Sequence, residues 1–382
     1  MDFRPSDDQV QLSSLAADWV AREVVPHARD WDRAEQVDPG IVKRLGEVGF
    51  LGLGIDEAYG GSGGDMVSYA LVLEELGRGD TSVRGIVSVS LGLVAKTIQS
   101  RGTEAQKLAW LPGLTSGELV GCFALTEPGR GSDAASLTTR AARVGDSWVI
   151  NGAKTFITNG TWAHVALVFA RTGGAGPKGV SAFLVPTDAE GFSRREIKGK
   201  LGLRGQATAE LVFDDVRVSA DSMLGEEGQG FGIAMSALDK GRIAVAAGAV
   251  GLSRGCLEEA VAYALQRDQF GGPIAAKQLV QELLADMAVD VDCARILTLR
   301  AAWNVDSGQP YRTEASMAKL FATEAAVRVS NAALQVFGGY GYIDEFPVGK
   351  AMRDARVLTL YEGTSQIQKL LIGRALTGVS AF

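Results

Sequence analysis

The spacing of hydrophobic residues changes twice along the chain. In residues 7–25, apolar side chains recur every three or four positions, which predicts an amphipathic helix. Two more helices are predicted: one begins at Asp38-Pro39-Gly40, with Asp38 as its cap and Pro39 in its first turn, and another covers residues 66–78 after a glycine-rich stretch. The first third of the chain is therefore predicted to be helical.

The middle of the chain follows the two-residue period of strands. Its four short runs of β-branched and aromatic residues are separated by Gly, Asp and Asn, and they cover residues 147–152, 164–171, 180–186 and 209–218. Such runs predict a mostly antiparallel β domain of about a hundred residues.

A helical period returns after Gly230 and continues to the C-terminus. Three long Ala- and Leu-rich segments without proline, and a shorter one after Thr364, predict an antiparallel bundle. The predicted fold class is α+β. Its three parts are an N-terminal helical domain of residues 1–118, a central antiparallel β domain of residues 119–228 and a C-terminal four-helix bundle of residues 229–382.

Composition narrows the possible classes. A length of 382 residues exceeds one domain, and 46% hydrophobic with 22% charged residues is ordinary for a globular protein. The net charge of −7 argues against nucleic-acid and anionic-membrane partners. No apolar run approaches the roughly 20 residues of a membrane span, and the first ten residues are too polar for a signal peptide. We therefore expect a cytoplasmic protein.

The cysteines and histidines indicate neither a disulfide framework nor a metal site. Cys122, Cys256 and Cys293 are an odd number at wide spacing, which fits a reducing compartment. His27 and His164 lie far apart, so a zinc site would lack ligands. No metal is predicted.

A glycine motif at residues 174–179, GAGPKG, matches the pattern GxGxxG. A dinucleotide fingerprint needs a strand, a glycine turn and a helix N-terminus in that order. This motif lies between two strand-like runs and opens no helix, so it predicts a hairpin loop.

Two segments could hold a planar polar ligand. ALTEPGRGSD, residues 124–133, combines backbone freedom with hydroxyl and carboxyl groups, although an ordinary turn has the same composition. In KTFITNG, residues 154–160, Phe156 and Thr158 would share one face of a strand. The ring could then stack on a ligand while the hydroxyl bonds to its edge.

Glu362 is a candidate general base. It follows the uncharged stretch 357–361, and a carboxylate in apolar surroundings has a raised pKa that suits proton abstraction. The alternative role is a first-turn acid of the helix that follows, favoured by the helix dipole.

Arg84 is the only charged residue between Asp80 and Lys96. A buried guanidinium in such a stretch needs an anion, and Ser88 would lie one helical turn further on the same face. Arg84 could instead be exposed, or form an internal salt bridge to Glu74 or Glu75.

Together these motifs resemble the acyl-CoA dehydrogenase family over essentially the full length and in the same α, β, α order. The resemblance rests on ALTEPGRGSD, on FITNG and on the block that runs from QVFGGYGY to LYEGTSQ. It implies FAD as cofactor, an acyl-CoA substrate, an electron-transfer flavoprotein as electron acceptor and a homotetramer.

In that family FAD lies between the β domain and the C-terminal bundle. The resemblance assigns contacts with the flavin ring to Phe123, Leu125, Thr126, Phe156 and Thr158. It assigns contacts with a neighbouring subunit's flavin to Arg267, Phe270 and Gln278, and contacts with the rest of FAD to Gln335, Gly338, Gly339, Thr364 and Gln366.

Glu362 occupies the position of the family's catalytic base. The resemblance implies that it removes the pro-R α-proton while the β-hydrogen leaves as a hydride to flavin N5, giving a trans-2-enoyl thioester. The backbone N–H of Glu362 and a flavin ribityl hydroxyl would stabilise the enolate. Some relatives carry the base at the position of Gly241, which has no side chain here. Residues matching the CoA side of the site are Ser132, Asp239, Arg242 and Gly363. Ser132 is assigned a pantetheine or ribose contact and is also counted among the residues that bind FAD.

The segment DTSVRGIVSVS resembles glutaryl-CoA dehydrogenases, in which the residues matching Arg84 and Ser88 bind the distal carboxylate. This predicts a dicarboxylyl-CoA substrate, glutaryl- or adipyl-CoA. Decarboxylating members carry Glu at the position of Gly77, so this chain differs from them there. Tyr361, in contrast, is the residue that decarboxylating members have beside the base. Oxidation with loss of CO2 and oxidation without it are therefore both open. A short-chain, butyryl-type dehydrogenase, an enoyl-CoA reductase and an acyl-CoA oxidase also fit the motifs.

Overall fold

A computed structural model describes residues 5–380. Outside the described residues lie residues 1–4 and 381–382. The first range belongs to the polar segment that argues against a signal peptide, and the second to the predicted C-terminal domain. The N-terminal part is helical, as predicted. Its elements are α1 (Asp7–Glu23), α2 (Ala28–Ala34), α3 (Ile41–Glu47), η1 (Glu57–Tyr59), α4 (Met66–Gly79), α5 (Thr81–Val87), the π-helix η2 (Ser88–Ala95), α6 (Lys96–Arg101) and α7 (Glu104–Ser116).

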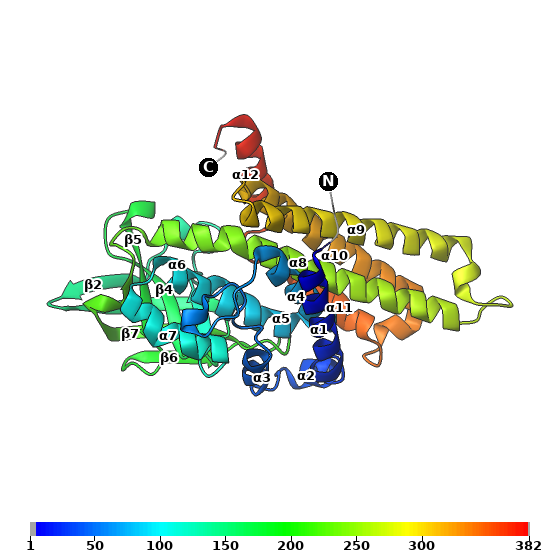
Figure 1. Cartoon of the computed structure of the whole chain (residues 1–382), viewed down its shortest axis with the longest axis horizontal. Helices are drawn as coiled ribbons and strands as arrows, with labels where there is room; N and C mark the ends of the chain where they lie inside the picture. The colour runs from blue at the N-terminus through cyan, green and yellow to red at the C-terminus, as the bar shows by residue number, and fades with distance from the viewer. Residues whose placement is uncertain (1–4, 381–382) are drawn as a thin grey trace.

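One sheet forms the middle of the chain and lies at one end of the molecule (Figure 1). Its strands are β1 (Gly121–Ala124), β2 (Arg140–Val144), β3 (Ser147–Thr158), β4 (Val165–Arg171), β5 (Val180–Pro186), β6 (Phe192–Glu196), β7 (Thr208–Ser219) and β8 (Met223–Leu224). The order is β6-β7-β3-β2-β4-β5-β8, with β1 paired to β4. Only the pairings of β4 with β1 and β2 are parallel, so the prediction of a mostly antiparallel domain is confirmed. Residues 174–179 connect the antiparallel strands β4 and β5, as expected of a hairpin loop.

The C-terminal part is a bundle of long helices. Its elements are α8 (Gly230–Gln266), α9 (Gln278–Asp306), α10 (Arg312–Phe337), α11 (Pro347–Leu358) and α12 (Ser365–Thr377). α10 contacts α8, α9, α11 and α12, and α12 projects from the bundle (Figure 1). The sequence analysis missed α11, although Pro347 in its first turn is a typical helix-start signal. The predicted α+β fold class is otherwise confirmed.

A continuous helical rod, Thr81–Arg101, joins α5, η2 and α6. By length and mean hydropathy its 21 residues could span a membrane, so the expectation that no apolar run approaches this length is wrong. However, 89% of its most apolar window is buried inside the protein. The rod contacts β1 and α8, and it therefore lies where the β domain meets the bundle.

A buried ion pair fixes the loop that follows β1. Lys154 is fully buried in β3, and its Nζ lies 2.9 Å from Oε1 of Glu127 and donates to the carbonyl of Leu125 at 3.1 Å. Glu127 also accepts hydrogen bonds from Thr138 and Thr139. Burial opposes ionisation of Glu127, but the Lys154 ammonium and these hydrogen bonds outweigh it and lower the pKa of Glu127 to about 2.

We predict that Glu127→Gln destabilises the protein by about 3–5 kcal/mol at neutral pH, because it leaves the Lys154 charge buried and unpaired. In the wild type, the contribution of Glu127 is complete above its ordinary pKa of 4.5 and is lost as the pH falls towards 2. Denaturant unfolding at several pH values measures both effects. The double variant Glu127→Gln/Lys154→Met removes both charges and should lose less stability than the single variant; an equal or larger loss would contradict this explanation.

Candidate active site

Glu362 lies in a strained turn between α11 and α12. Its φ angle is 51° and that of Gly363 is 92°, both in the left-handed region. The side chain of Thr364 caps α12, which begins at Ser365. Glu362 therefore precedes the cap, and the alternative role of a first-turn acid is wrong.

Two side chains hold this turn in place. The Nζ of Lys319, on α10, donates to the carbonyl of Gly363 at 2.8 Å. The Nε2 of Gln368 donates to the carbonyls of Glu362 at 3.3 Å and of Gly363 at 3.0 Å. A left-handed conformation costs a residue with a side chain about 1–2 kcal/mol, so these contacts stabilise a turn that the chain disfavours on its own.

The carboxyl group of Glu362 occupies a gap between α8 and η2. A Cβ atom at Gly241 would lie 2.2 Å from Oε2 of Glu362 and 3.0 Å from Cδ2 of Leu93. Oε2 is buried and forms no hydrogen bond within residues 5–380, and the N–H of Glu362 has no acceptor there either. Buried polar atoms without partners are uncommon, so the turn presents one acceptor and one donor that a ligand could engage.

The charge state of Glu362 depends on its surroundings. Burial raises the pKa of Glu362, while Arg84, Lys319 and Arg242 act in the opposite direction. The predicted raised pKa is confirmed. Its cause is enclosure by other helices, not the uncharged stretch that precedes Glu362 in the sequence.

Arg84 is buried beside this turn, with 1% of its surface exposed. Its Nη1 donates to Oγ of Ser88 at 3.0 Å, as their spacing predicts, and its Nη2 donates to the hydroxyl of Tyr361. Its Nε is buried without a partner among the described residues. The hydrogen-bond partners of Arg84 therefore carry no negative charge, although the Glu362 carboxyl group lies close enough to interact with it electrostatically.

Two alternatives were expected for Arg84, exposure to solvent or a salt bridge to Glu74 or Glu75, and both are wrong. Glu74 binds Arg254 at 2.5 Å and Arg295 at 3.0 Å. Glu75 likewise binds Arg254 and Arg78. Because both carboxylates are occupied by other arginines, Arg84 forms no ion pair within residues 5–380, and it is not exposed.

Tyr69 is a site residue that the sequence analysis missed. Its hydroxyl is buried without a hydrogen-bond partner among residues 5–380 and would lie 2.4 Å from a Cβ atom at Gly92 in η2. Burial and the charge of Glu362 raise the pKa of Tyr69, whereas Arg84 lowers it. In the sequence, a tyrosine within an apolar helix is indistinguishable from an ordinary core residue.

An apolar patch continues the gap away from Glu362. Val89 and Leu93 of η2 pack with Ala237 of α8, and Phe123 and Leu238 border them. These side chains offer a surface for an alkyl chain.

Asp239 and Arg242, predicted on the CoA side, lie close together on α8. Both are buried, and Nη1 of Arg242 is 2.6 Å from Oδ1 of Asp239. Arg312 pairs with the second carboxylate oxygen at 2.9 Å. By contrast, Ser132 lies exposed in the loop after β1, away from this pair in the chain.

The segments expected to border the flavin ring are joined to each other. The N–H of Thr155 donates to the carbonyl of Thr126 at 2.9 Å. Phe156 adopts a left-handed conformation where the β3–β7 register shifts, and 69% of its surface is exposed. Ile157 is buried while Thr158 is partly exposed, so Phe156 and Thr158 both lie outside the core.

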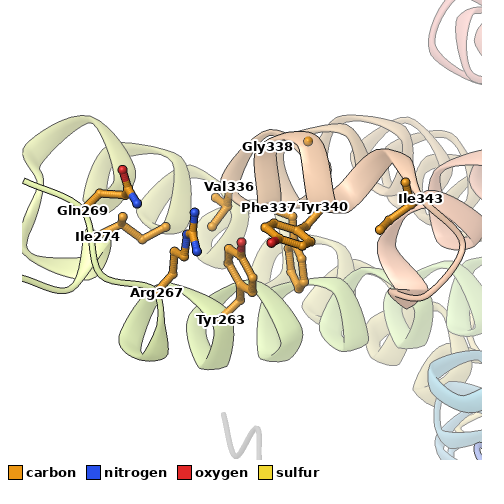
Figure 2. A pocket seen from close by; sticks show the side chains of 10 residues that line it. Tyr263, Arg267, Gln269, Ile274, Val336, Phe337, Gly338, Tyr340 and Ile343 are labelled. Atoms are coloured by element: carbon orange, nitrogen blue, oxygen red, sulfur yellow. The ribbon is translucent and has the colours of Figure 1, made fainter.

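A second group of predicted cofactor residues meets at the far end of the bundle. Tyr263 and Arg267, at the end of α8, and residues at the end of α10 line an open pocket of about 440 Å³ (Figure 2). Within this lining the ring of Tyr263 stacks on that of Phe337, with 4.1 Å between the ring centroids. Gly338 and Gly339 line this pocket, and a Cβ atom at either would meet nothing within 4 Å. A ligand could therefore approach the backbone closely.

The remaining predicted cofactor residues are exposed or already engaged. Phe270 adopts a left-handed conformation and has 92% of its surface exposed. Gln278, Gln335 and Gln366 are also exposed. The hydroxyl of Thr364 accepts from the N–H of Ile367 at 3.2 Å as the cap of α12. Thr364 lies two residues after Glu362, whereas Glu362 is not among the residues that line the pocket of Figure 2.

Acyl-CoA dehydrogenase family models match all three parts of the chain. The N-terminal domain matches residues 6–118, the middle domain residues 122–216 and the C-terminal domain residues 228–377. The chain belongs to the acyl-CoA dehydrogenase family. It is an oxidoreductase that acts on CH–CH donors, and the expectations of this enzyme class and of FAD as its cofactor are confirmed.

Relatives of two substrate types resemble the protein about equally. The human mitochondrial short-chain specific acyl-CoA dehydrogenase is 45% identical, with 96% of this chain and 89% of that protein covered. Butyryl-CoA dehydrogenase from Megasphaera elsdenii is 41% identical with a TM-score of 0.96 and covers 98% of this chain and 100% of its own. Glutaryl-CoA dehydrogenase from Mycobacterium smegmatis, in complex with FADH2, is 36% identical with a TM-score of 0.95, and the match covers 99% of this chain and 96% of that protein.

We predict that Gly241→Ala slows substrate-dependent flavin reduction about tenfold or more. The new methyl group would displace the Glu362 carboxylate, and misplacement of a reacting group by about 1 Å can cost a factor of about 100. Stopped-flow measurement of flavin bleaching tests this. Gly232→Ala, at an open position of the same helix where a Cβ meets no atom within 4 Å, is the control. Equal rates in the wild type and Gly241→Ala would show that the carboxylate has room to spare.

Proposed function

We propose that the protein oxidises a dicarboxylyl-CoA thioester, glutaryl- or adipyl-CoA, to the trans-2-enoyl thioester, with Glu362 as the base. The observation that carries the substrate choice is Arg84. Among the described residues it is a buried cation without a carboxylate partner, and it lies beside the gap that holds the Glu362 carboxyl group.

Glu362 has the features that abstraction of an α-proton requires. Its Oε2 is unpartnered among residues 5–380, and its raised pKa makes the carboxylate a stronger base than an exposed one. The N–H of the same residue could donate to the thioester oxygen, on which negative charge develops. FAD, when bound, supplies the acceptor for the hydride that leaves the β-carbon.

The chain offers two surfaces for FAD. The first consists of the loop after β1 and the exposed Phe156 with Thr158, and we assign it to the flavin ring. The second is the open pocket of Figure 2 with Arg267, and we assign it to the cofactor of a neighbouring subunit. This division requires an oligomer, for which we propose a homotetramer. We also propose an electron-transfer flavoprotein as the electron acceptor.

Arg84 is proposed to bind the distal carboxylate of the substrate. Its Nε and Nη groups could form charge-assisted hydrogen bonds, with Ser88 and Tyr361 beside them. A Cβ atom at Gly77 would lie 2.4 Å from the carbonyl oxygen of Gly248, so α4 has no room for a side chain there. This favours oxidation without decarboxylation, because no carboxylate can project from that position.

A butyryl-type short-chain dehydrogenase is the second candidate. The apolar patch of Val89, Leu93 and Ala237 suits a short alkyl chain. The 45% identity to the human short-chain enzyme favours it as well. In that case Arg84 has a structural role.

Glu362→Gln tests the proposed base. We expect the variant to bind thioesters but to lose flavin reduction by at least about 10³-fold, because an amide cannot accept the α-proton. The matched control is Glu345→Gln, at an exposed position, which should behave as the wild type. Normal bleaching of the flavin in Glu362→Gln would refute the assignment.

Anaerobic titration with glutaryl-, adipyl- and butyryl-CoA tests the substrate. We expect the dicarboxylyl thioesters to bleach the flavin preferentially. Arg84→Ala should reverse this order, since loss of a charge-assisted pair costs a factor of about 10 to 100 in binding. Arg101→Ala, at the exposed end of the same helical rod, should keep the wild-type order. Preference of the wild type for butyryl-CoA would identify a short-chain dehydrogenase.

A further inference from the structure

Lys319 is a buried charge that the proposed function does not use. It has 0% of its surface exposed and lies on α10, on the same helix face as Ala315, Ala322 and Thr323. An ammonium group in such a place is costly to bury unless an anion compensates it.

Lys319 differs from Lys154, which is also fully buried. Lys154 lies 2.9 Å from the carboxylate of Glu127. Lys319 forms no ion pair within the part of the chain that the structure describes, and its ammonium donates instead to the carbonyl of Gly363. Lys319 therefore lacks the direct partner that normally accounts for a buried lysine.

Its position connects Lys319 to Glu362 in two ways. The hydrogen bond to Gly363 holds the peptide directly after Glu362, in a turn where both residues have left-handed conformations. The charges also interact: burial lowers the pKa of Lys319 to about 8, and Glu362 is the first of the groups that raise it. The Lys319 ammonium is therefore charged below about pH 8.

We propose that Lys319 is a positioning residue for Glu362: it holds the turn that carries the base, and its positive charge favours the ionised form of the base. This inference rests on the proposed function, in which Glu362 is the base. The inference places Lys319, a residue of α10, among the groups that influence the pH at which Glu362 is deprotonated.

Other groups act on Glu362 and must be held constant in a test. Arg84 faces it from α5, Tyr69 from α4 and Arg242 from α8, while Tyr361 precedes it in the chain. Behind them, Asp239 neutralises part of the charge of Arg242, and Glu324 lies near Lys319. Lys319 is the cation among them that donates to a backbone carbonyl of the turn, whereas Arg84 bonds to the side chain of Tyr361.

The experiment compares the wild type with Lys319→Met and Lys319→Gln, all loaded with FAD. Difference infrared spectra of the substrate-free proteins are recorded across a range of pH. The band of the protonated Glu362 carboxyl group is identified by its absence from Glu362→Gln, and the pH at which this band reaches half its intensity is the pKa of Glu362. The pH dependence of flavin bleaching by substrate gives a second measure. Lys319→Gln serves if Lys319→Met does not fold, since an amide retains a donor without the charge.

We expect both Lys319 variants to raise the pKa of Glu362 by about one unit and to move the acid limb of flavin reduction upwards by the same amount. Thr323→Val is the control. Thr323 is equally buried one turn away and donates to the carbonyl of Lys319, but its replacement changes no charge.

An unchanged pKa of Glu362 in the Lys319 variants, or an equal shift in Thr323→Val, would overturn the inference. Flavin reduction that persists in Glu362→Gln would instead refute the proposed function itself, and the inference with it. The two failures are therefore distinguishable.

Discussion

The Oε2 atom of Glu362 is buried between α8 and η2, and the packing of the surrounding helices depends on the space that this carboxyl group occupies. A carboxylate in such a place loses its hydration, which raises its pKa. Three cations from different helices oppose this effect without closing on its Oε2. A direct ion pair would stabilise the carboxylate more, but it would also occupy the atom that accepts the α-proton in the proposed function. Cations placed at a distance therefore favour the ionised carboxylate and still leave its Oε2 atom free of a hydrogen bond within residues 5–380.

Close helix packing makes room for this arrangement. At Gly241 the helix surface carries no side chain, so the carboxyl group of Glu362 fits against α8. At Gly77 and Gly248 the backbones of α4 and α8 approach each other directly, and the side chain of Arg84 lies against Gly248. The glycines determine how near the acidic and basic groups can come to each other, because a methyl group at any of them would meet an atom at 2.2 to 2.7 Å.

Several other charges near this site are paired with one another. Glu74 and Glu75 of α4 bind Arg254 of α8, and Lys350 of α11 binds Asp80 at the start of the rod and Asp354. This matters for Arg84, because both carboxylates of α4 already have partners. A buried arginine in this position keeps donors available for an anion from outside the chain.

The order of the three parts of the chain and the family to which it belongs follow from the sequence alone. The period of apolar residues predicted the α, β, α order, and three separated motifs, one of them around Glu362, identified the family, because these signals are local. A lone charge in an apolar stretch singled out Arg84, and the same reasoning would have found Lys319 in ASMAKLFA. The tertiary structure decided which charges are paired, why the pKa of Glu362 is raised, and that the hydroxyl of Tyr69 lacks a partner among residues 5–380. These properties depend on segments that are far apart in the chain, and only packing of α4, η2, α8 and α10 brings them together. Electrostatic energy depends on distance and burial, which a one-dimensional pattern does not contain.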